Sequence, residues 1–194
     1  MIDTRQKILE SNFKAMHRSG YNAMRADKEI LKLGITKGAL YHHFPTKQDL
    51  GYAIVDELIY KDYVGGWSPL NTYRGNPIDF IVSHLNALQQ ECTDKEIGFG
   101  CPLNNLIQEM SPTDKGFRIR LARILNEMHT IIKNALTRGQ KNGGVSKSIK
   151  PDATVWFILS AMEGGYAMGK ATQSREVFIQ ATDQLILYLE SLKV

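Results

Sequence analysis

The sequence contains little cysteine and no metal-binding pattern. Its 194 residues include two cysteines, Cys92 and Cys101, which form neither a Cys-x-x-Cys pair nor a disulfide framework. The five histidines show no Glu-x-x-His or His-x-x-x-His spacing, which argues against a zinc or di-iron site in a helical bundle. We therefore expect no metal and no cofactor. We interpret the cysteines as buried thiols; a redox- or electrophile-sensing role for one of them is the alternative.

Long apolar runs are also missing. No run reaches the roughly 18–20 residues that span a bilayer. The first residues, MIDTRQKIL, carry charge from Asp3 onward and have no apolar core, so they do not resemble a signal peptide. Hydrophobic residues make up 43% of the chain and charged residues 23%, as in folded soluble proteins. We expect a cytoplasmic protein with no membrane partner.

The formal net charge of +4 is distributed unevenly. The first 50 residues contain nine lysines and arginines and five acidic residues, whereas residues 51–194 contain fifteen of each kind. The excess positive charge therefore lies in the first quarter of the chain. A small basic region favours binding to a polyanion through counterion release.

Apolar residues recur at helical spacing along nearly the whole chain, which predicts an all-α fold with about nine helices. Within it, Asn76-Pro77 is expected to cap and begin a helix, and residues 93–100 are expected to form a loop. A long helix follows, and its three early arginines are interpreted as a solvated face. These arginines are Arg118, Arg120 and Arg123.

The segment Thr36–Phe44, which reads TKGALYHHF, has the layout of the second half of a helix-turn-helix. Gly34 ends the preceding helix, Thr36 can cap a short helix, and Thr46 opens the next one with a pattern like a capping box. The second helix of such a motif lies in the major groove of DNA, while Leu40 and Phe44 should pack inside. The residues expected to contact DNA are Arg25, Thr36, Lys37, Gly38, Ala39, Tyr41, His42 and Lys47.

This segment resembles the signature of the TetR/AcrR family of transcriptional regulators, together with Gly20-Tyr21 ahead of it and Pro45-Thr46-Lys47 after it. The resemblance covers about the first 60 residues. A weaker similarity, to one branch of the family's effector domains, lies in GCPLNNLIQEM, residues 100–110. The resemblance implies a homodimer with two DNA-binding heads. It also implies that the last two helices form the dimer interface and that the middle helices enclose an effector pocket.

We therefore expect a helix-turn-helix DNA-binding domain over residues 1–47, a connecting helix over 48–66, and a ligand-binding and dimerisation domain over 67–194. The last two expected helices are apolar almost all round, so each must be covered on a second face. Either this pair is central in its own domain or it faces another subunit. The residues expected at the dimer interface are Val155, Leu159, Met162, Phe178, Leu185, Tyr188 and Leu189.

An effector pocket should be mostly apolar with few polar groups. Its candidate residues are His84, Phe99, Asn104, Gln108, Phe117, Met128, Trp156 and Tyr166. The expected function is a ligand-responsive repressor that a small molecule releases from a palindromic double-stranded DNA operator. A thiol-sensing regulator of the same fold, using Cys92 or Cys101, is one alternative. A helical enzyme or carrier is another, but the sequence has no nucleophile–base pair or metal spacing, and we expect no enzymatic activity.

Overall fold

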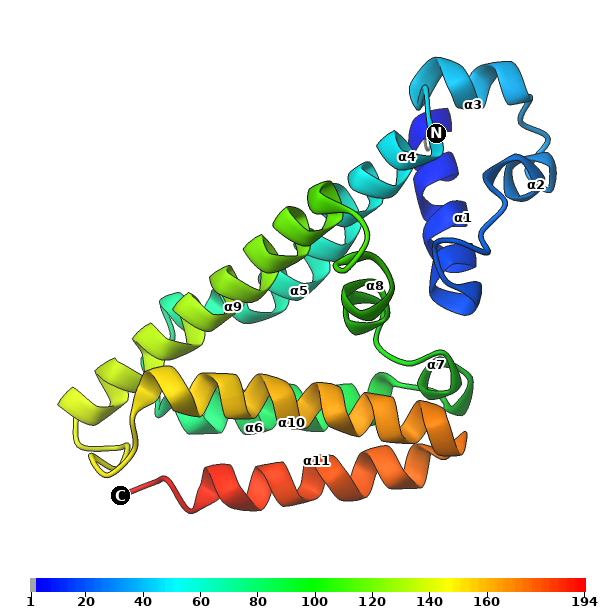
Figure 1. The fold of residues 1–194 in the computed structure, drawn as a ribbon. Helices are drawn as coiled ribbons and strands as arrows, with labels where there is room; N and C mark the ends of the chain where they lie inside the picture. Colours follow the sequence, from blue (N-terminus) through cyan, green and yellow to red (C-terminus); the bar gives the residue numbers. More distant parts are fainter. Residues whose placement is uncertain (1–2) are drawn as a thin grey trace. The chain divides into compact units, whose positions relative to one another are not determined.

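The computed structural model describes residues 3–194, and most of them lie in helices (Figure 1). The all-α fold class is confirmed. No helix of this described range is long and apolar enough to cross a membrane. In chain order the α-helices are α1 (Thr4–Ser19), α2 (Ala26–Leu31), α3 (Lys37–His43), α4 (Lys47–Ala53), α5 (Tyr60–Trp67), α6 (Pro77–Glu91), α7 (Asp94–Phe99), α8 (Pro102–Met110), α9 (Lys115–Lys141), α10 (Pro151–Thr172) and α11 (Arg175–Glu190).

The chain divides into two compact units. The first contains the residues up to Asp62 together with Pro102–Ile124, and the second contains Tyr63–Cys101 together with Leu125–Val194. The described part of the expected DNA-binding domain, 1–47, falls within the first unit. The units do not follow the chain in order, because α8 and the beginning of α9 belong with the N-terminal helices.

The first unit begins with a three-helix head formed by α1, α2 and α3 (Figure 1). Leu9 of α1, Ile30 of α2 and Leu40 of α3 are each at most 3% exposed and form its core with Phe44. The turn between α2 and α3 contains Gly34, whose φ of 69° is a conformation that glycine adopts without steric cost. The helix-turn-helix head predicted from the sequence is therefore confirmed.

The two predicted helix caps of the head are present. The Thr36 hydroxyl accepts a hydrogen bond from the Ala39 N–H at 3.2 Å and begins α3. At α4 the Asp49 N–H donates to the Thr46 hydroxyl, and the Thr46 N–H donates to the Asp49 carboxylate, each at 3.0 Å. This reciprocal pair is a capping box with aspartate in the usual place of glutamate.

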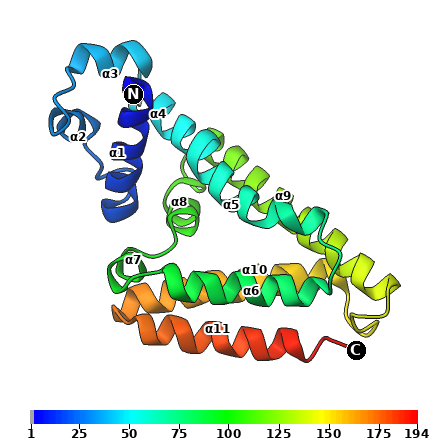
Figure 2. The same cartoon turned by 180° about the vertical axis from the view of Figure 1, so that it is seen from behind.

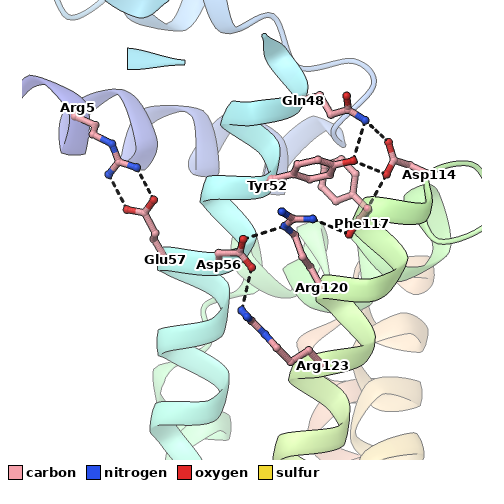
Figure 3. Close-up of polar contacts among 10 residues, drawn as sticks. Arg5, Gln48, Tyr52, Asp56, Glu57, Asp114, Phe117, Arg120 and Arg123 are labelled. Atoms are coloured by element: carbon pink, nitrogen blue, oxygen red, sulfur yellow. Dashed lines mark hydrogen bonds and ion pairs between the residues drawn. The ribbon is translucent and has the colours of Figure 1, made fainter. Parts of the chain in front are cut away.

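A π-helical turn, η1 (Ile54–Ile59), joins α4 to α5. Its wider winding carries two acidic residues, Asp56 and Glu57, that both form ion pairs within the first unit. Glu57 accepts a hydrogen bond from Arg5 of α1 at 2.7 Å. Asp56 accepts from Arg120 and Arg123 of α9, both at 2.9 Å (Figure 3). The π turn therefore links the helix that follows the head to both α1 and α9.

The arginines of α9 meet the expectation of a solvated face only in part. Arg120 and Arg123 pair with Asp56, and their guanidinium groups also lie over the rings of Tyr52 and Tyr60, 4.0 and 4.7 Å from the ring centroids. Arg118 donates to the carbonyl of Ser111 at 2.9 Å. Arg118 and Arg123 are exposed, as expected, but the ion pairs with Asp56 were not foreseen because that partner lies more than sixty positions away in the sequence.

Asp114 forms a second connection between α4 and α9. Its carboxylate accepts from the Phe117 N–H at 2.9 Å, which caps the beginning of α9. It also accepts from the Tyr52 hydroxyl at 2.8 Å and the Gln48 amide at 2.6 Å, both on α4 (Figure 3). The hydrogen bond from Phe117, opposed by burial and helped by the two α4 side chains, lowers the pKa of Asp114.

The second unit is built around α6, α10 and α11, which lie side by side in both ribbon views (Figures 1 and 2). Asn76 caps α6 by accepting from the Ile78 N–H at 3.0 Å, as expected. The segment expected as a loop at residues 93–100 contains α7 instead. A capping box between Thr93 and Glu96 stabilises this short helix, and it packs against α10 and α11.

The apolar residues expected at the dimer interface mostly form the core of the second unit. Six of them are at most 3% exposed because α10 and α11 pack on each other and on α6 and α7. These six are Val155, Leu159, Met162, Phe178, Leu185 and Leu189. Within one chain these six side chains are therefore covered, whereas Tyr188 is half-buried beside Phe157, with 4.9 Å between ring centroids. The large apolar side chains of α10 and α11 that are 41–61% exposed are Trp156, Phe157, Met168 and Leu187.

Replacing Asp114 with alanine removes the cap of α9 and leaves the Tyr52 hydroxyl without this acceptor. Loss of a helix cap costs about 0.5–2 kcal/mol, so we expect the free energy of unfolding to fall by about 1–2 kcal/mol in urea denaturation. Gln48→Ala removes one exposed donor and should cost less than about 0.5 kcal/mol. Equal losses in the two variants would show that the cap does not stabilise the unit.

Candidate DNA interface and effector site

The helix α3 presents a polar face to solvent and an apolar face to the head core. Leu40 is 3% exposed, whereas Tyr41 is 53% exposed. Most of the other residues expected to contact DNA are exposed as well, and Ala39 and Lys47 are half-buried. The exposed ones are Arg25, Thr36, Lys37, Gly38, Tyr41 and His42. The head core therefore holds the polar face of α3 in one orientation, ready to meet a partner.

Arg25 and Lys37 belong to one charged group beside the N-terminus of α3. The Asp27 carboxylate lies between them, 3.7 Å from Arg25 Nε and 3.3 Å from Lys37 Nζ. Both cationic side chains are more than half exposed, so these ion pairs are weak and a phosphate can compete for either cation. The two cationic side chains and the N–H groups of the first helical turn make this end of α3 suited to binding an anion.

Lys47 is held by the chain itself. Its Nζ donates to the carbonyl of Asn22 at 3.0 Å and lies 4.8 Å from the centroid of the Tyr21 ring. Burial lowers the pKa of this ammonium group, against the attraction of Glu109. Lys47 and Tyr41 line the same small cavity, of about 40 Å³, beside α3. The two residues therefore lie close enough to contact one stretch of DNA backbone.

A glutamate that sequence reasoning did not single out fixes the connection between α1 and α2. The Glu109 carboxylate, near the end of α8, accepts from the backbone N–H groups of Tyr21 and Asn22 at 2.8 and 2.7 Å. Gly20 precedes them with a φ of 84° and would bring a Cβ to 3.1 Å from the same carboxylate. The sequence marks Gly20-Tyr21 as part of the family signature, but no nearby residue indicates that Glu109 is its partner.

The eight residues expected to bind an effector are divided between the two units. Asn104, Gln108 and Phe117 belong to the first unit and the other five to the second. Phe117 is fully buried between the rings of Tyr21 and Tyr52, at 4.8 and 5.0 Å. In this position Phe117 is a core residue of the first unit.

Among the five in the second unit, the surroundings also differ. His84 packs against Trp67 with 4.4 Å between ring centroids, and burial lowers its pKa. Met128 is fully buried. Trp156 is 41% exposed and stacks on His129 at 4.4 Å, so it lies at the surface. Phe99 is half-buried and is the last residue of α7. The fifth residue, Tyr166, takes part in a cluster of polar side chains.

That group, which we call the Glu163 cluster, consists of Tyr63, Cys92, Cys101, Glu163 and Tyr166, all in the second unit. The Tyr63 hydroxyl is 2.9 Å from Cys101 Sγ, and the Tyr166 hydroxyl is 3.2 Å from Cys92 Sγ. Cys101 Sγ donates to Glu163 Oε1 at 3.4 Å. The other carboxylate oxygen, Oε2, is shielded from solvent and has no hydrogen-bond partner among residues 3–194.

The cluster is strongly desolvated. Burial raises the pKa of the Tyr63 and Tyr166 hydroxyls, and it raises the pKa of the Cys92 thiol against a hydrogen bond from Tyr166. Cys101 is 2% exposed. A reactive thiol is both accessible and low in pKa. Neither cysteine has both properties. The thiol-sensing alternative is therefore not favoured over a ligand-responsive regulator.

One sequence signal could have identified Glu163. In α10 it is the one charged residue between Asp152 and Lys170, in a stretch that reads ATVWFILSAMEGGYAMG. A single carboxylate in such a helix needs a reason, because burying it without a partner is costly. Tyr63 carries no comparable signal, since a tyrosine in a mixed helix is ordinary.

A separate cavity of about 290 Å³ opens in the second unit near the beginning of α6. Arg74 and Arg138 contribute guanidinium groups to it, and Asn76 and Asn142 contribute amides. None of the eight expected effector residues lines this cavity. Arg138 is already bonded to the carbonyl of Leu70 at 2.7 Å.

The capped, outward-facing α3 on a packed three-helix head defines a helix-turn-helix DNA-binding protein with a larger helical unit attached. Comparison with family profiles agrees. "Bacterial regulatory proteins, tetR family" matches residues 8–54, and "Tetracyclin repressor-like, C-terminal domain" matches residues 80–185. The chain belongs to the TetR family, and it is a ligand-responsive, DNA-binding transcriptional regulator.

Individual relatives are distant in sequence and similar along the whole chain. The transcriptional repressor DhaR of Mycobacterium sp. (strain GP1) is 22% identical over 172 residues, covering 89% of this chain and 85% of DhaR. The structure of reduced E. coli NemR superposes with a TM-score of 0.82 at 20% identity, covering 99% of this chain and 98% of NemR. A TetR-family regulator from Agrobacterium tumefaciens gives a TM-score of 0.85 at 18% identity, covering 98% and 97%.

The Glu163 carboxyl should make stability depend on pH. Burial raises its pKa to about 7, from an ordinary value of 4.5 that applies to the unfolded chain. Between these values the folded protein keeps a proton that the unfolded chain loses, so this contribution to stability is complete below about pH 4.5 and is lost as the pH rises through about 7. The quantity to measure is the difference in free energy of unfolding between the wild type and Glu163→Gln. We expect this difference to fall by roughly 2–3 kcal/mol between about pH 5 and pH 8.

Urea denaturation of both proteins at the two pH values measures this difference. The glutamine variant serves as the control, because every other titrating group is common to both proteins. A difference that stays constant or rises with pH would mean that the folded protein holds Glu163 ionised.

Proposed function

We propose that this protein is a homodimeric repressor whose two α3 helices bind successive major grooves of a palindromic operator, and that a small molecule releases it. The observation that carries the proposal is the exposed polar face of α3, held by a buried apolar face and a Thr36 cap. Two heads related by a two-fold axis would bind half-sites about 34–36 Å apart. The names of the relatives DhaR and NemR, both described as repressors, support this direction of control.

The dimer would form through the outward face of α10 and α11. Phe157, Ser160, Gly164 and Met168 are exposed at steps of three or four residues along α10, so they lie on one helical face. Gly164 has no heavy atom within 4 Å of the position that a Cβ would occupy. Leu187 of α11 is 61% exposed. A face with apolar ends and a small residue between them allows a second copy of α10 to approach closely.

The effector would act by binding one head spacing better than another and shifting the population toward it. The α8 helix is the candidate connection, because Glu109 near its end holds the N–H groups of Tyr21 and Asn22. A displacement of α8 along its axis would therefore move the beginning of the α2–α3 hairpin. We further infer that the protein acts on DNA in the cytoplasm and catalyses no reaction.

Tyr41→Ala and Lys47→Ala test the DNA interface. The experiment is a footprint on the DNA upstream of its own gene, followed by titrations at several salt concentrations. Both variants should bind more weakly than the wild type. Lys47→Ala should also lower the slope of log affinity against log salt by about one unit for each head, as a lost phosphate contact requires.

Tyr73→Ala is the matched control, since Tyr73 is also an exposed tyrosine, 39% against 53% for Tyr41, but lies in the second unit. Thermal unfolding of the Lys47 variant checks that loss of its contact with Asn22 leaves the head folded. Wild-type affinity in both head variants would refute the interface, and absence of any footprint would refute the repressor proposal itself.

Gly164→Arg tests the dimer. The open space around Gly164 accepts a side chain within one subunit, and arginine suits a helix interior better than glycine, so the subunit should stay folded. At the proposed interface the same side chain would place two like charges against each other, and sedimentation should detect monomers.

Gly65→Arg provides the control, because Gly65 is also an exposed helical glycine with no heavy atom within 4 Å of where a Cβ would lie. It lies on α5, away from the proposed face. A dimer of unchanged stability in Gly164→Arg would place the interface elsewhere.

A further inference from the structure

Glu163 lacks a hydrogen-bond donor that a buried carboxylate requires. Its Oε2 atom is shielded from solvent and unpartnered within the described chain, and its Oε1 atom accepts only the weak thiol donor of Cys101 at 3.4 Å among the contacts resolved there. Buried polar atoms in native proteins nearly always have partners, and each exception calls for an explanation. The residue as a whole is only half-buried, although Oε2 itself is shielded.

The neighbouring hydroxyl groups do not supply the missing donor. Tyr63 points its hydroxyl at Cys101 Sγ, at 2.9 Å, and Tyr166 points its hydroxyl at Cys92 Sγ, at 3.2 Å. Rotating either hydroxyl toward Glu163 would break its contact with the thiol. The donors near the carboxylate are therefore used by other partners, and Oε2 accepts no hydrogen bond from the described residues.

No cation of the described chain forms an ion pair with Glu163. Arg175, which reaches the cluster at Cys92, directs its guanidinium to the backbone carbonyls of Cys92 and Gln89, at 2.8 and 2.6 Å. These two short hydrogen bonds hold it in place. A positive charge beside Glu163 would therefore come from outside the chain.

Two tyrosines belong to the same cluster as the carboxylate. Tyr166 is three residues from Glu163 on α10, and its ring packs on Phe178 with 4.5 Å between centroids. Tyr63 joins the cluster through Cys101. Ring faces attract cations and provide apolar area for a flat ligand. The cluster therefore combines one acidic acceptor with two tyrosine side chains.

We propose that Glu163 is the polar anchor of the effector site and selects a flat aromatic ligand that carries a protonated nitrogen, such as an amidinium. This inference rests on the proposed function, because it names the chemical class of the molecule that controls the repressor. The ligand's N–H donates to Oε2 and its charge pairs with the carboxylate. Its ring lies against Tyr63 and Tyr166. Burial raises the pKa of the free carboxyl to about 7, and a bound cation would favour the ionised form.

The test is calorimetric titration of the full-length protein with benzamidine, with benzamide as the neutral molecule of the same shape. Charge-assisted hydrogen bonds to a buried group contribute enough to favour the cation by roughly tenfold or more. We expect the wild type to bind benzamidine at least about tenfold more tightly than benzamide. Glu163→Gln should remove this preference.

Two further variants complete the experiment. Glu176→Gln removes an exposed carboxylate of α11 and should keep the wild-type preference, which excludes an effect of net charge. Glu163→Asp keeps the charge on a shorter side chain and should retain a preference for benzamidine. This variant tests the role of the charge if the glutamine variant does not fold. Equal affinity of the wild type for the two molecules, or an unchanged preference in Glu163→Gln, would overturn the proposal.

The titration contains no DNA, so its result is independent of the footprint. A footprint without selective benzamidine binding would refute the anchor role of Glu163 and leave the repressor in place. Selective binding without a footprint would support the site and refute the proposed function.

Discussion

The ion pairs and hydrogen bonds that join α4 and its π-helical continuation to α9 hold the first unit together. Asp114 links the cap of α9 to Tyr52, and Asp56 joins the π turn to Arg120 and Arg123. Because α4 begins at the capping box directly after α3, the position of α3 depends on these contacts. Each aspartate has several donors, so losing one contact leaves the others in place. Two acidic residues outside the helix-turn-helix therefore help to position the helix that follows the DNA-facing one.

The sequence was sufficient for the head because the head is built from local signals. Thr36 caps α3 through the residue three positions later, and Thr46 and Asp49 form a capping box over the same distance. Leu40 and Phe44 are buried four positions apart, as one face of a helix requires. The capping box of α7 was equally local, from Thr93 to Glu96, but went unrecognised because glycine and charged residues surround it.

The contacts outside the head's local caps could not be predicted, because they join residues that are distant in sequence. Arg120 needs Asp56, sixty-four positions away, and Glu109 needs the N–H groups of Tyr21 and Asn22, more than eighty positions away. The faces of α10 and α11 show the same difficulty. Both helices are apolar nearly all round, so the periodicity could not distinguish Leu159, inside the unit, from Phe157, outside it. Only the packing of α6 and α7 resolves this choice.

The same long-range geometry gives α8 its importance. This helix begins immediately after Cys101, which contacts Glu163, and carries Glu109 on its last turn. Its nine residues span only about 13 Å at 1.5 Å per residue, and a helix of this length moves as a rigid body. Glu109 accepts two backbone N–H groups whose directions are fixed by the peptide planes. A shift of α8 would therefore tend to displace Tyr21 and Asn22, to the extent that the Glu109 side chain does not adjust. In the proposed repressor Glu163 would receive the ligand, and Glu109 connects α8 to the DNA-binding head.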